Sequence, residues 1–93
     1  MKKFMLLHSG FEKPPPEIMP GWQVWFESIT DQQVAQGGFA GGRETSRDGT
    51  RELPWDKEAV TGYNIIEAAN LDAAEKLTRG NPFISSIRSY ELR

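Results

Sequence analysis

The sequence predicts one α+β domain of the ferredoxin-like type, in which a βαββαβ chain order builds a four-stranded antiparallel sheet. Three observations support this prediction. Segments with the composition of strands occur at the start, in the second half and at the end of the chain. Two segments with helical spacing lie between strands. The length of 93 residues suits a single domain, residues 1–93, and is below the size at which chains divide.

The first two elements are an apolar strand at residues 3–9 and a helix. We expect the helix to begin between Pro15 and Pro20, because proline is tolerated only in the first turn of a helix. It should end near Gln36, where Gly37-Gly38 supplies a stop signal. The apolar stripe of this helix has a period of 3.6 residues and consists of Ile18, Trp22, Trp25, Phe26 and Ile29.

The remaining elements follow from turn and capping signals. Asp48-Gly49 is a strong hairpin signal, Pro54 ends the pairing that follows it, and Asn70 is a good N-cap. The predicted elements are a glycine-rich strand at 39–47, a brief return strand at 50–53, a third strand at 60–69, a second helix at 71–79 and a last strand at 84–92.

The predicted strands carry apolar residues on both faces. Phe4 and Leu6 face one side of the first strand, whereas Met5 and Leu7 face the other, and the strand at 60–69 repeats this pattern. Two helices cover only one face of a four-stranded sheet, so the second face needs another cover. We therefore expect a homodimer that pairs through the sheet face.

Composition excludes several classes of partner. The net charge is −2 with both signs interspersed, so the basic face of a nucleic-acid-binding domain is absent, and Tyr63 alone does not provide the paired aromatics of an RNA-binding sheet. With one His and no Cys, we expect neither a metal site nor a disulfide, and no cofactor is predicted. A small molecule or another protein remains the expected partner.

The N-terminal apolar run stops at His8. It is therefore too short for the apolar region of a signal peptide and far too short to span a membrane. The absence of Cys fits a reducing compartment. We expect a cytoplasmic protein without a membrane partner.

The predicted topology gathers several chemically useful residues at one edge of the sheet. The first strand ends beside the starts of the third and fourth strands, and sites usually lie on loops gathered in this way. His8 is the natural general base, because its ordinary pKa lies near neutrality, and Asp56 would orient it or hold it protonated. The alternative is that His8 closes a strand and bonds locally. The candidate ligand-binding residues at this edge are Ser9, Arg47, Trp55 and Ser86.

Two other motifs have structural explanations as well as functional ones. The glycine-rich run 37–42 resembles a phosphate loop in composition, but it follows a predicted helix and opens a strand, so close packing and bulging explain it better. Trp22, Trp25 and Phe26 have the spacing of core residues, with a pocket wall as the alternative. Trp55 lies in a loop, where it would either cover a pocket or pack across the dimer.

Six segments together resemble the YCII-related family, in particular its DGPF-type branch. They are Lys3-Phe4-Met5-Leu6-Leu7, Gly62-Tyr63-Asn64-Ile65-Ile66-Glu67-Ala68, Leu71-Asp72, Asn81-Pro82-Phe83, Ile87-Arg88 and Tyr90-Glu91. The resemblance extends in order over nearly the whole chain. It implies a ferredoxin-like fold that forms a dimeric α+β barrel. It also implies relatives that use a His–Asp pair in a cleft and a branch similar to dehydrochlorinases of aromatic degradation.

The sequence departs from the family in two places. The Asp-Gly-Pro-Phe signature is absent, and the nearest segment reads Asp48-Gly49-Thr50-Arg51. The dyad His of the family lies beyond the first strand, whereas His8 closes that strand, so the dyad is not transferred to this chain.

Two functions remain open from the sequence, in which no constellation of residues specifies a reaction. The first is a small-molecule binder or enzyme with a pocket between sheet and loops near His8. The alternative is a non-catalytic regulatory or accessory protein that acts through protein partners. The feature that separates them is whether His8 lines a cavity.

Overall fold

The computed structural model describes residues 1–11, 19–82 and 85–93. The predicted helix start before residue 19 and the predicted start of the last strand at Ile84 lie outside the described residues. The elements are β1 (Lys2–Ser9), α1 (Met19–Ser28), β2 (Gln33–Gly38), β3 (Arg43–Ser46), β4 (Gly49–Glu52), β5 (Val60–Ala68), α2 (Leu71–Thr78) and β6 (Ser86–Glu91). Neither helix among these residues is long and apolar enough to cross a membrane.

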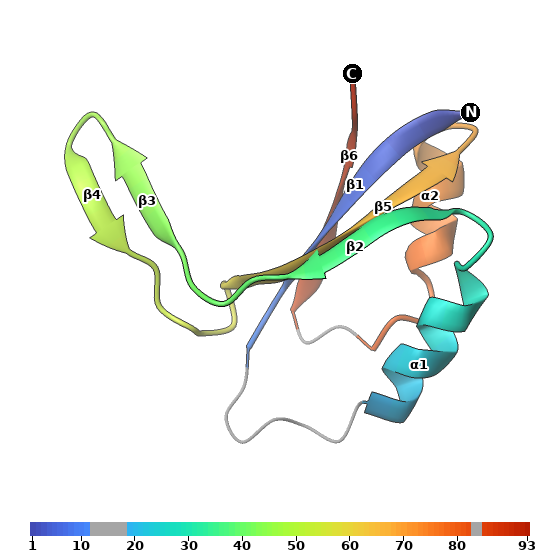
Figure 1. The fold of residues 1–93 in the computed structure, drawn as a ribbon, viewed down its shortest axis with the longest axis horizontal. Helices are drawn as coiled ribbons and strands as arrows, with labels where there is room; N and C mark the ends of the chain where they lie inside the picture. Colours follow the sequence, from blue (N-terminus) through green and yellow to red (C-terminus); the bar gives the residue numbers. More distant parts are fainter. Residues whose placement is uncertain (12–18, 83–84) are drawn as a thin grey trace.

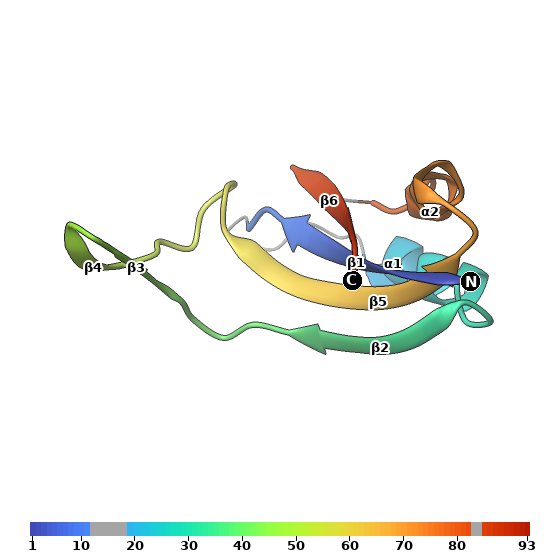
Figure 2. The same cartoon turned by 90° about the horizontal axis from the view of Figure 1, so that it is seen from above.

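The predicted α+β, ferredoxin-like fold is confirmed. Strands β2, β5, β1 and β6 form one antiparallel sheet in that order, with β1 and β5 in the centre (Figure 1). Both helices lie on the same side of this sheet (Figure 2). The C-terminal end of β1 lies beside the start of β5 and the start of β6, as the topology requires.

The core lies between the helices and the sheet. Its buried members come from β1, β5, both helices and the turn after α1, and are Phe4, Leu6, Trp25, Ile29, Ile66, Ala68 and Ala74. The indole of Trp25 donates to the carbonyl oxygen of Leu77 at 2.8 Å, which ties α1 to the end of α2. Asn70 caps α2, because its Oδ1 accepts a hydrogen bond from the amide of Ala73 at 2.8 Å.

The predicted end of the first helix is wrong. Helix α1 ends at Ser28, and the chain turns at Ile29, whose carbonyl accepts hydrogen bonds from the amides of Gln32 and Gln33. The side chains of Ser28 and Thr30 bond to carbonyls of the last helical turn. The carbonyls of Trp25 and Phe26, which accept these bonds, also accept from the amide of Ile29, and the helix ends nine residues before Gly37.

The predicted second strand of the sheet at 39–47 is also misplaced. The sheet strand is β2, and Gly37-Gly38 closes it instead of ending a helix. Here the glycines serve close packing. A Cβ on Gly37 would lie 2.5 Å from the ring of Tyr63, so the ring rests directly on the backbone of the neighbouring strand.

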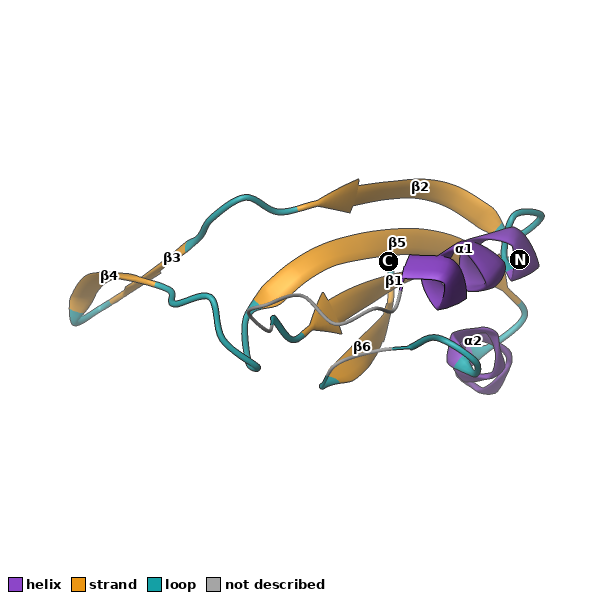
Figure 3. Ribbon diagram, turned by 90° about the horizontal axis from the view of Figure 1, so that it is seen from below, coloured by secondary structure: helices purple, strands orange, loops and turns teal. Residues whose placement is uncertain are grey.

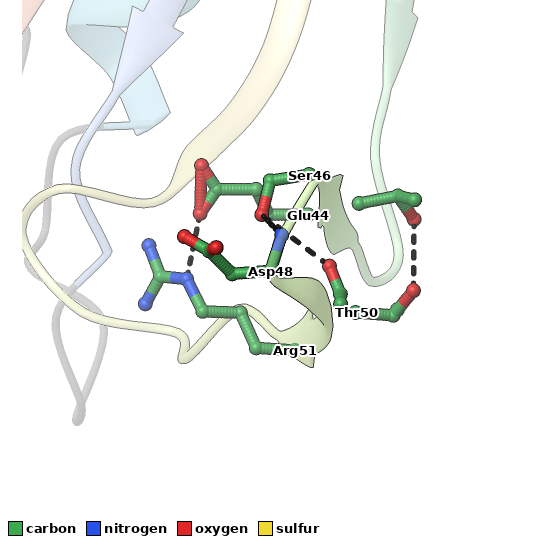
Figure 4. A network of polar contacts seen from close by, with 7 residues as sticks. Glu44, Ser46, Asp48, Thr50 and Arg51 are labelled. Atoms are coloured by element: carbon green, nitrogen blue, oxygen red, sulfur yellow. Dashed lines mark hydrogen bonds and ion pairs between the residues drawn. The ribbon is translucent and has the colours of Figure 1, made fainter.

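Strands β3 and β4 form a separate hairpin that extends away from the sheet (Figure 3). The predicted hairpin is present, but its turn consists of Arg47 and Asp48, one residue earlier than predicted, and Gly49 begins β4 with a φ of 124°, which favours glycine. Within the hairpin, Arg51 Nε donates to Glu44 Oε2 at 2.6 Å, and the amide of Asp48 donates to Ser46 Oγ at 3.2 Å (Figure 4). All eight residues of its two strands are exposed.

Both faces of the sheet carry apolar residues, as the strand patterns predict. Phe4, Leu6 and Ile66 are buried under the helices. On the opposite face, Met5 pairs with Ile65 and Leu7 pairs with Tyr63. We call this the open face, and these four side chains are only partly buried in the isolated chain.

The substitution Gly62→Ala should lower the free energy of unfolding by about 1–3 kcal/mol. The new Cβ would lie 2.9 Å from the carbonyl oxygen of Gly37 and would force β5 and β2 apart. Urea unfolding of both proteins measures the difference. The matched control is Gly41→Ala, whose Cβ meets no atom within 4 Å, and equal losses in the two variants would contradict the close approach of the strands.

Candidate functional site

A cavity of about 500 Å³ lies between α1 and the helix-covered side of the sheet near the end of β2. We call it the His8 cavity. Its walls include the aromatic rings of Trp22 and Phe26 from α1, the polar side chains of His8, Gln36 and Asn64, and the glycine backbone of β2 and β5. None of the described residues that line it is Asp, Glu, Lys or Arg.

The aromatic wall arises from the apolar stripe of α1. Trp22, Trp25 and Phe26 lie one turn apart, so they share the face of the helix that meets the sheet. Trp25 is fully buried in the core, whereas Trp22 and Phe26 are partly buried and also line the cavity. Trp25 is therefore a core residue, whereas Trp22 and Phe26 pack against the core and also form part of the cavity wall.

His8 is held by ring contacts as well as by its strand. It points to the helix side of β1, where its ring centroid lies 5.2 Å from Trp22 and 5.6 Å from Trp25, both in edge-on arrangements. The side chain is 6 % exposed. The cross-strand neighbours are Gly62 on β5 and Ile87 on β6. The absence of a side chain at Gly62 leaves room for the cavity next to the imidazole.

Two amide side chains continue from His8 into the sheet. His8 Nε2 and Asn64 Oδ1 lie 2.5 Å apart, and Asn64 Nδ2 donates to Gln33 Oε1 at 2.6 Å. The other ring nitrogen, Nδ1, is shielded from solvent and has no hydrogen-bond partner among the described residues. Burial lowers the pKa of His8 below its ordinary value of 6.5, and the hydrogen bond to Asn64 opposes this only in part. Burial thus favours the neutral form of His8.

The predicted site residues other than His8 lie outside the His8 cavity. Ser9 pairs with Ser86 across β1 and β6, so these two come together at the expected edge. Asp56 lies in the expected loop, where its backbone carbonyl accepts from the Phe11 amide, but its Oδ1 accepts from the amide of Glu58. The partner of His8 in the structure is Asn64 and not Asp56.

Arg47 and Trp55 belong to other parts of the molecule. Arg47 lies in the turn between β3 and β4, at the tip of the projecting hairpin. Trp55 packs on Phe11 with ring centroids 5.6 Å apart and lines a second cavity of about 490 Å³ with Phe39 and Leu53. That cavity holds only exposed charged groups, whereas the His8 cavity contains a buried titratable group. The His8 cavity is thus the better candidate site.

Sequence reasoning did not identify Asn64 and Gln33. Asn64 is 1 % exposed in the centre of the most β-prone strand, and asparagine is unfavourable at such a position. An asparagine in the centre of a strongly β-prone segment was therefore the sequence feature that could have identified Asn64. Among the described residues, no group of three or more His, Cys, Asp or Glu side chains is arranged to hold a metal ion.

Comparisons with known proteins agree with the fold. The family model of the YCII-related domain matches residues 26–93. No curated protein matches the chain. Among solved structures, the chain is similar to 5-chloro-2-hydroxyhydroquinone dehydrochlorinase (TftG) from Burkholderia phenoliruptrix AC1100, in complex with 2,5-dihydroxybenzoquinone. The TM-score is 0.64 at 11 % sequence identity, with 98 % of this chain and 93 % of that chain covered.

The free energy of unfolding should depend on the protonation of His8. Because the pKa of His8 is lowered in the folded state, the unfolded chain takes up a proton at a higher pH than the folded chain. Above pH 6.5, neutral His8 therefore makes its full contribution to the free energy of unfolding. This contribution is lost as the pH falls from there through the folded pKa, by at most about 1.4 kcal/mol per pH unit.

Urea unfolding at a series of pH values checks this prediction. The control is His8→Gln, which keeps a polar side chain beside Asn64 but does not titrate. The variant should lack the loss of stability just below pH 6.5. If both proteins lose stability with the same slope in this range, other groups cause the pH dependence.

Proposed function

This chain belongs to the YCII-related domain family, and on that premise we propose that it binds an uncharged, ring-bearing small molecule in the His8 cavity and acts on it through His8. The principal support is Nδ1 of His8, a buried acceptor without a partner among the described residues, on a side chain that lines a cavity. A buried polar atom left unpaired is unfavourable in the free protein and becomes favourable once a ligand donor reaches it.

The walls of the cavity favour a flat and uncharged ligand. Trp22 and Phe26 provide aromatic surface, and Gln36 provides an amide group for hydrogen bonds. A phosphate or carboxylate ligand would meet no Lys or Arg among the described lining residues, so its desolvation would be uncompensated. The solved structure named above holds 2,5-dihydroxybenzoquinone, which shares the planar hydroxylated ring but is an anion at neutral pH.

The chemistry of this arrangement is removal of a proton from a ring hydroxyl. The O–H bond of the ligand breaks, its electron pair stays on the oxygen, and the proton bonds to Nδ1 of His8. The products are an oxyanion and an imidazolium that lie side by side away from water, where their attraction is strong. Asn64 Oδ1 stabilises the imidazolium, because Nε2 carries a proton in that state.

The substitution His8→Gln should weaken binding of hydroquinone, an uncharged ring with two hydroxyl donors, at least about tenfold, the effect of one lost hydrogen bond in a desolvated site. Quenching of tryptophan fluorescence measures the affinity, because Trp22 lies in the cavity wall.

The matched control for this experiment is Trp55→Leu, which alters the second cavity and leaves the His8 cavity intact. This variant should bind the probe as tightly as the wild type does. Equal affinities of wild type and His8→Gln would exclude His8 from the site, and a selective loss in Trp55→Leu would assign the ligand to the second cavity.

We further propose that the protein acts as a homodimer that pairs through the open face of the sheet. The support is the apolar character of Met5, Leu7 and Ile65, which the two helices leave uncovered. Phe39 extends this surface, since its ring stacks on Tyr63 with centroids 5.7 Å apart. A domain of 93 residues has a small core of its own, and pairing of the open faces supplies a second one.

The substitution Ile65→Lys should convert the proposed dimer into a monomer or prevent stable folding, because it places a charge in the centre of the apolar open face. Light scattering coupled to gel filtration measures the mass of the particle. The control is Val24→Lys on α1, where the replaced side chain is already 69 % exposed. A dimer that is unaffected by Ile65→Lys would rule out pairing through this face.

A non-catalytic accessory role is the second candidate, favoured by the β3–β4 hairpin. The hairpin extends away from the sheet, and exposed apolar residues lie where it joins the rest of the chain, namely Phe39, Leu53 and Trp55. Surfaces of this kind serve contacts with other proteins. If the wild type fails to bind ring ligands, this candidate becomes the better one.

A further inference from the structure

We propose that Asn64 and Gln33 are positioning residues that hold His8 in one tautomer, with the proton on Nε2 and the free lone pair on Nδ1. The tautomer is a property of the ligand-free protein, and only its role in catalysis rests on the proposed function. It assigns a role to two polar side chains in the sheet that neither the core nor the family resemblance explains.

The direction of the hydrogen bonds follows from what each atom is able to donate. In one arrangement, His8 Nε2–H donates to Asn64 Oδ1, and Asn64 Nδ2 donates to Gln33 Oε1. In the reverse arrangement both amides turn over, Nε2 accepts, and the ring proton moves to Nδ1. That proton would then be buried without an acceptor among the described residues. An unpaired buried N–H is rarer and less favourable than an unpaired lone pair, which selects the first arrangement.

The β-bulge in β2 places Gln33 where it completes the chain of hydrogen bonds from His8 through Asn64, which we call the relay. Gln36 lies opposite Asn64 on the helix-covered side, so regular alternation would give Val34 the same side and would turn Gln33 to the open face. The register shifts between Gln33 and Ala35, and Gln33 consequently lies opposite the buried Ile66. The extra residue thus directs the Gln33 side chain toward Asn64, a role that bulges have beside functional sites.

The relay determines which nitrogen of His8 is available to a ligand. An amide oxygen beside Nε2 holds the proton there without adding a negative charge, so the imidazole stays neutral. The described groups that face the ring are Asn64, Gly62, Ile87, Trp22 and Trp25, none of which is ionisable. Nδ1 therefore carries the free lone pair of the ring and is shielded from water.

Nitrogen-15 NMR of the imidazole tests the proposal directly, because the chain has a single His and the spectrum contains one ring. In the free wild type above pH 7, the protonated nitrogen should be Nε2, and its proton should exchange slowly with water. In Asn64→Leu this slow exchange should be lost. A proton on Nδ1 in the wild type, or an unchanged Nε2 proton in Asn64→Leu, would overturn the relay.

Asn64→Asp keeps the acceptor and adds a charge, so the Nε2 proton should remain while the pKa of His8 rises by about one to three pH units. A residue that merely fills space at position 64 would leave that pKa unchanged. Gln33→Leu provides a further variant if Asn64→Leu does not fold, and it should speed exchange of the Nε2 proton.

The NMR experiment uses ligand-free protein, so its outcome does not depend on the proposed function. If the free protein has the Nε2 tautomer but binds no ring ligand, the relay is supported and the proposed function is rejected. An Nδ1 tautomer in a protein that binds the probe would reject the relay and the proton transfer to Nδ1, and would leave only ligand binding in the cavity.

Discussion

The hydrogen bond between His8 and Asn64 joins the two central strands on the face that both helices cover. Phe4, Leu6 and Ile66 make that layer apolar, so each of the two polar side chains depends on the other for a partner. A slip of β1 by one residue against β5 would turn His8 to the open face and leave Asn64 under the helices without this partner. The bond therefore specifies the register of β1 against β5, and the positions of the tryptophans that pack against the imidazole depend on it.

The uncovered apolar face is the second constraint on this fold. With two short helices, the chain buries one side of its sheet and leaves Met5, Leu7 and Ile65 only partly covered. The contact of Tyr63 with Gly37 and Phe39 adds aromatic surface to the same side. A second copy is the simplest cover, because two-fold symmetry presents each copy with the same surface that it must bury. In that arrangement the His8 cavity stays on the opposite side of the sheet, so assembly and ligand entry do not compete.

Most of the fold was predictable because its signals are local. Apolar and β-branched runs identified β1 and β5, and Asn70 identified the start of α2. Gly37-Gly38 was misinterpreted as a helix stop, because its true role is contact with the Tyr63 ring from another strand. In the site, His8 was identifiable as the one histidine, whereas Asn64 resembles an ordinary polar residue until its burial is known. The topology located the Asp56 loop correctly, but sequence does not indicate the direction of a loop side chain.

The identity of the group beside His8 decides what kind of chemistry the site supports. A carboxylate there would favour the imidazolium and suit an acid or an anion-binding site. An amide leaves the ring neutral, and the described walls of the cavity add no charge. Such a site gains most from a neutral ligand that carries an acidic hydroxyl, because the only charges then arise together, next to each other and away from water. On the proposed function, the amide of Asn64 therefore favours both the neutral form of His8 and a neutral ligand.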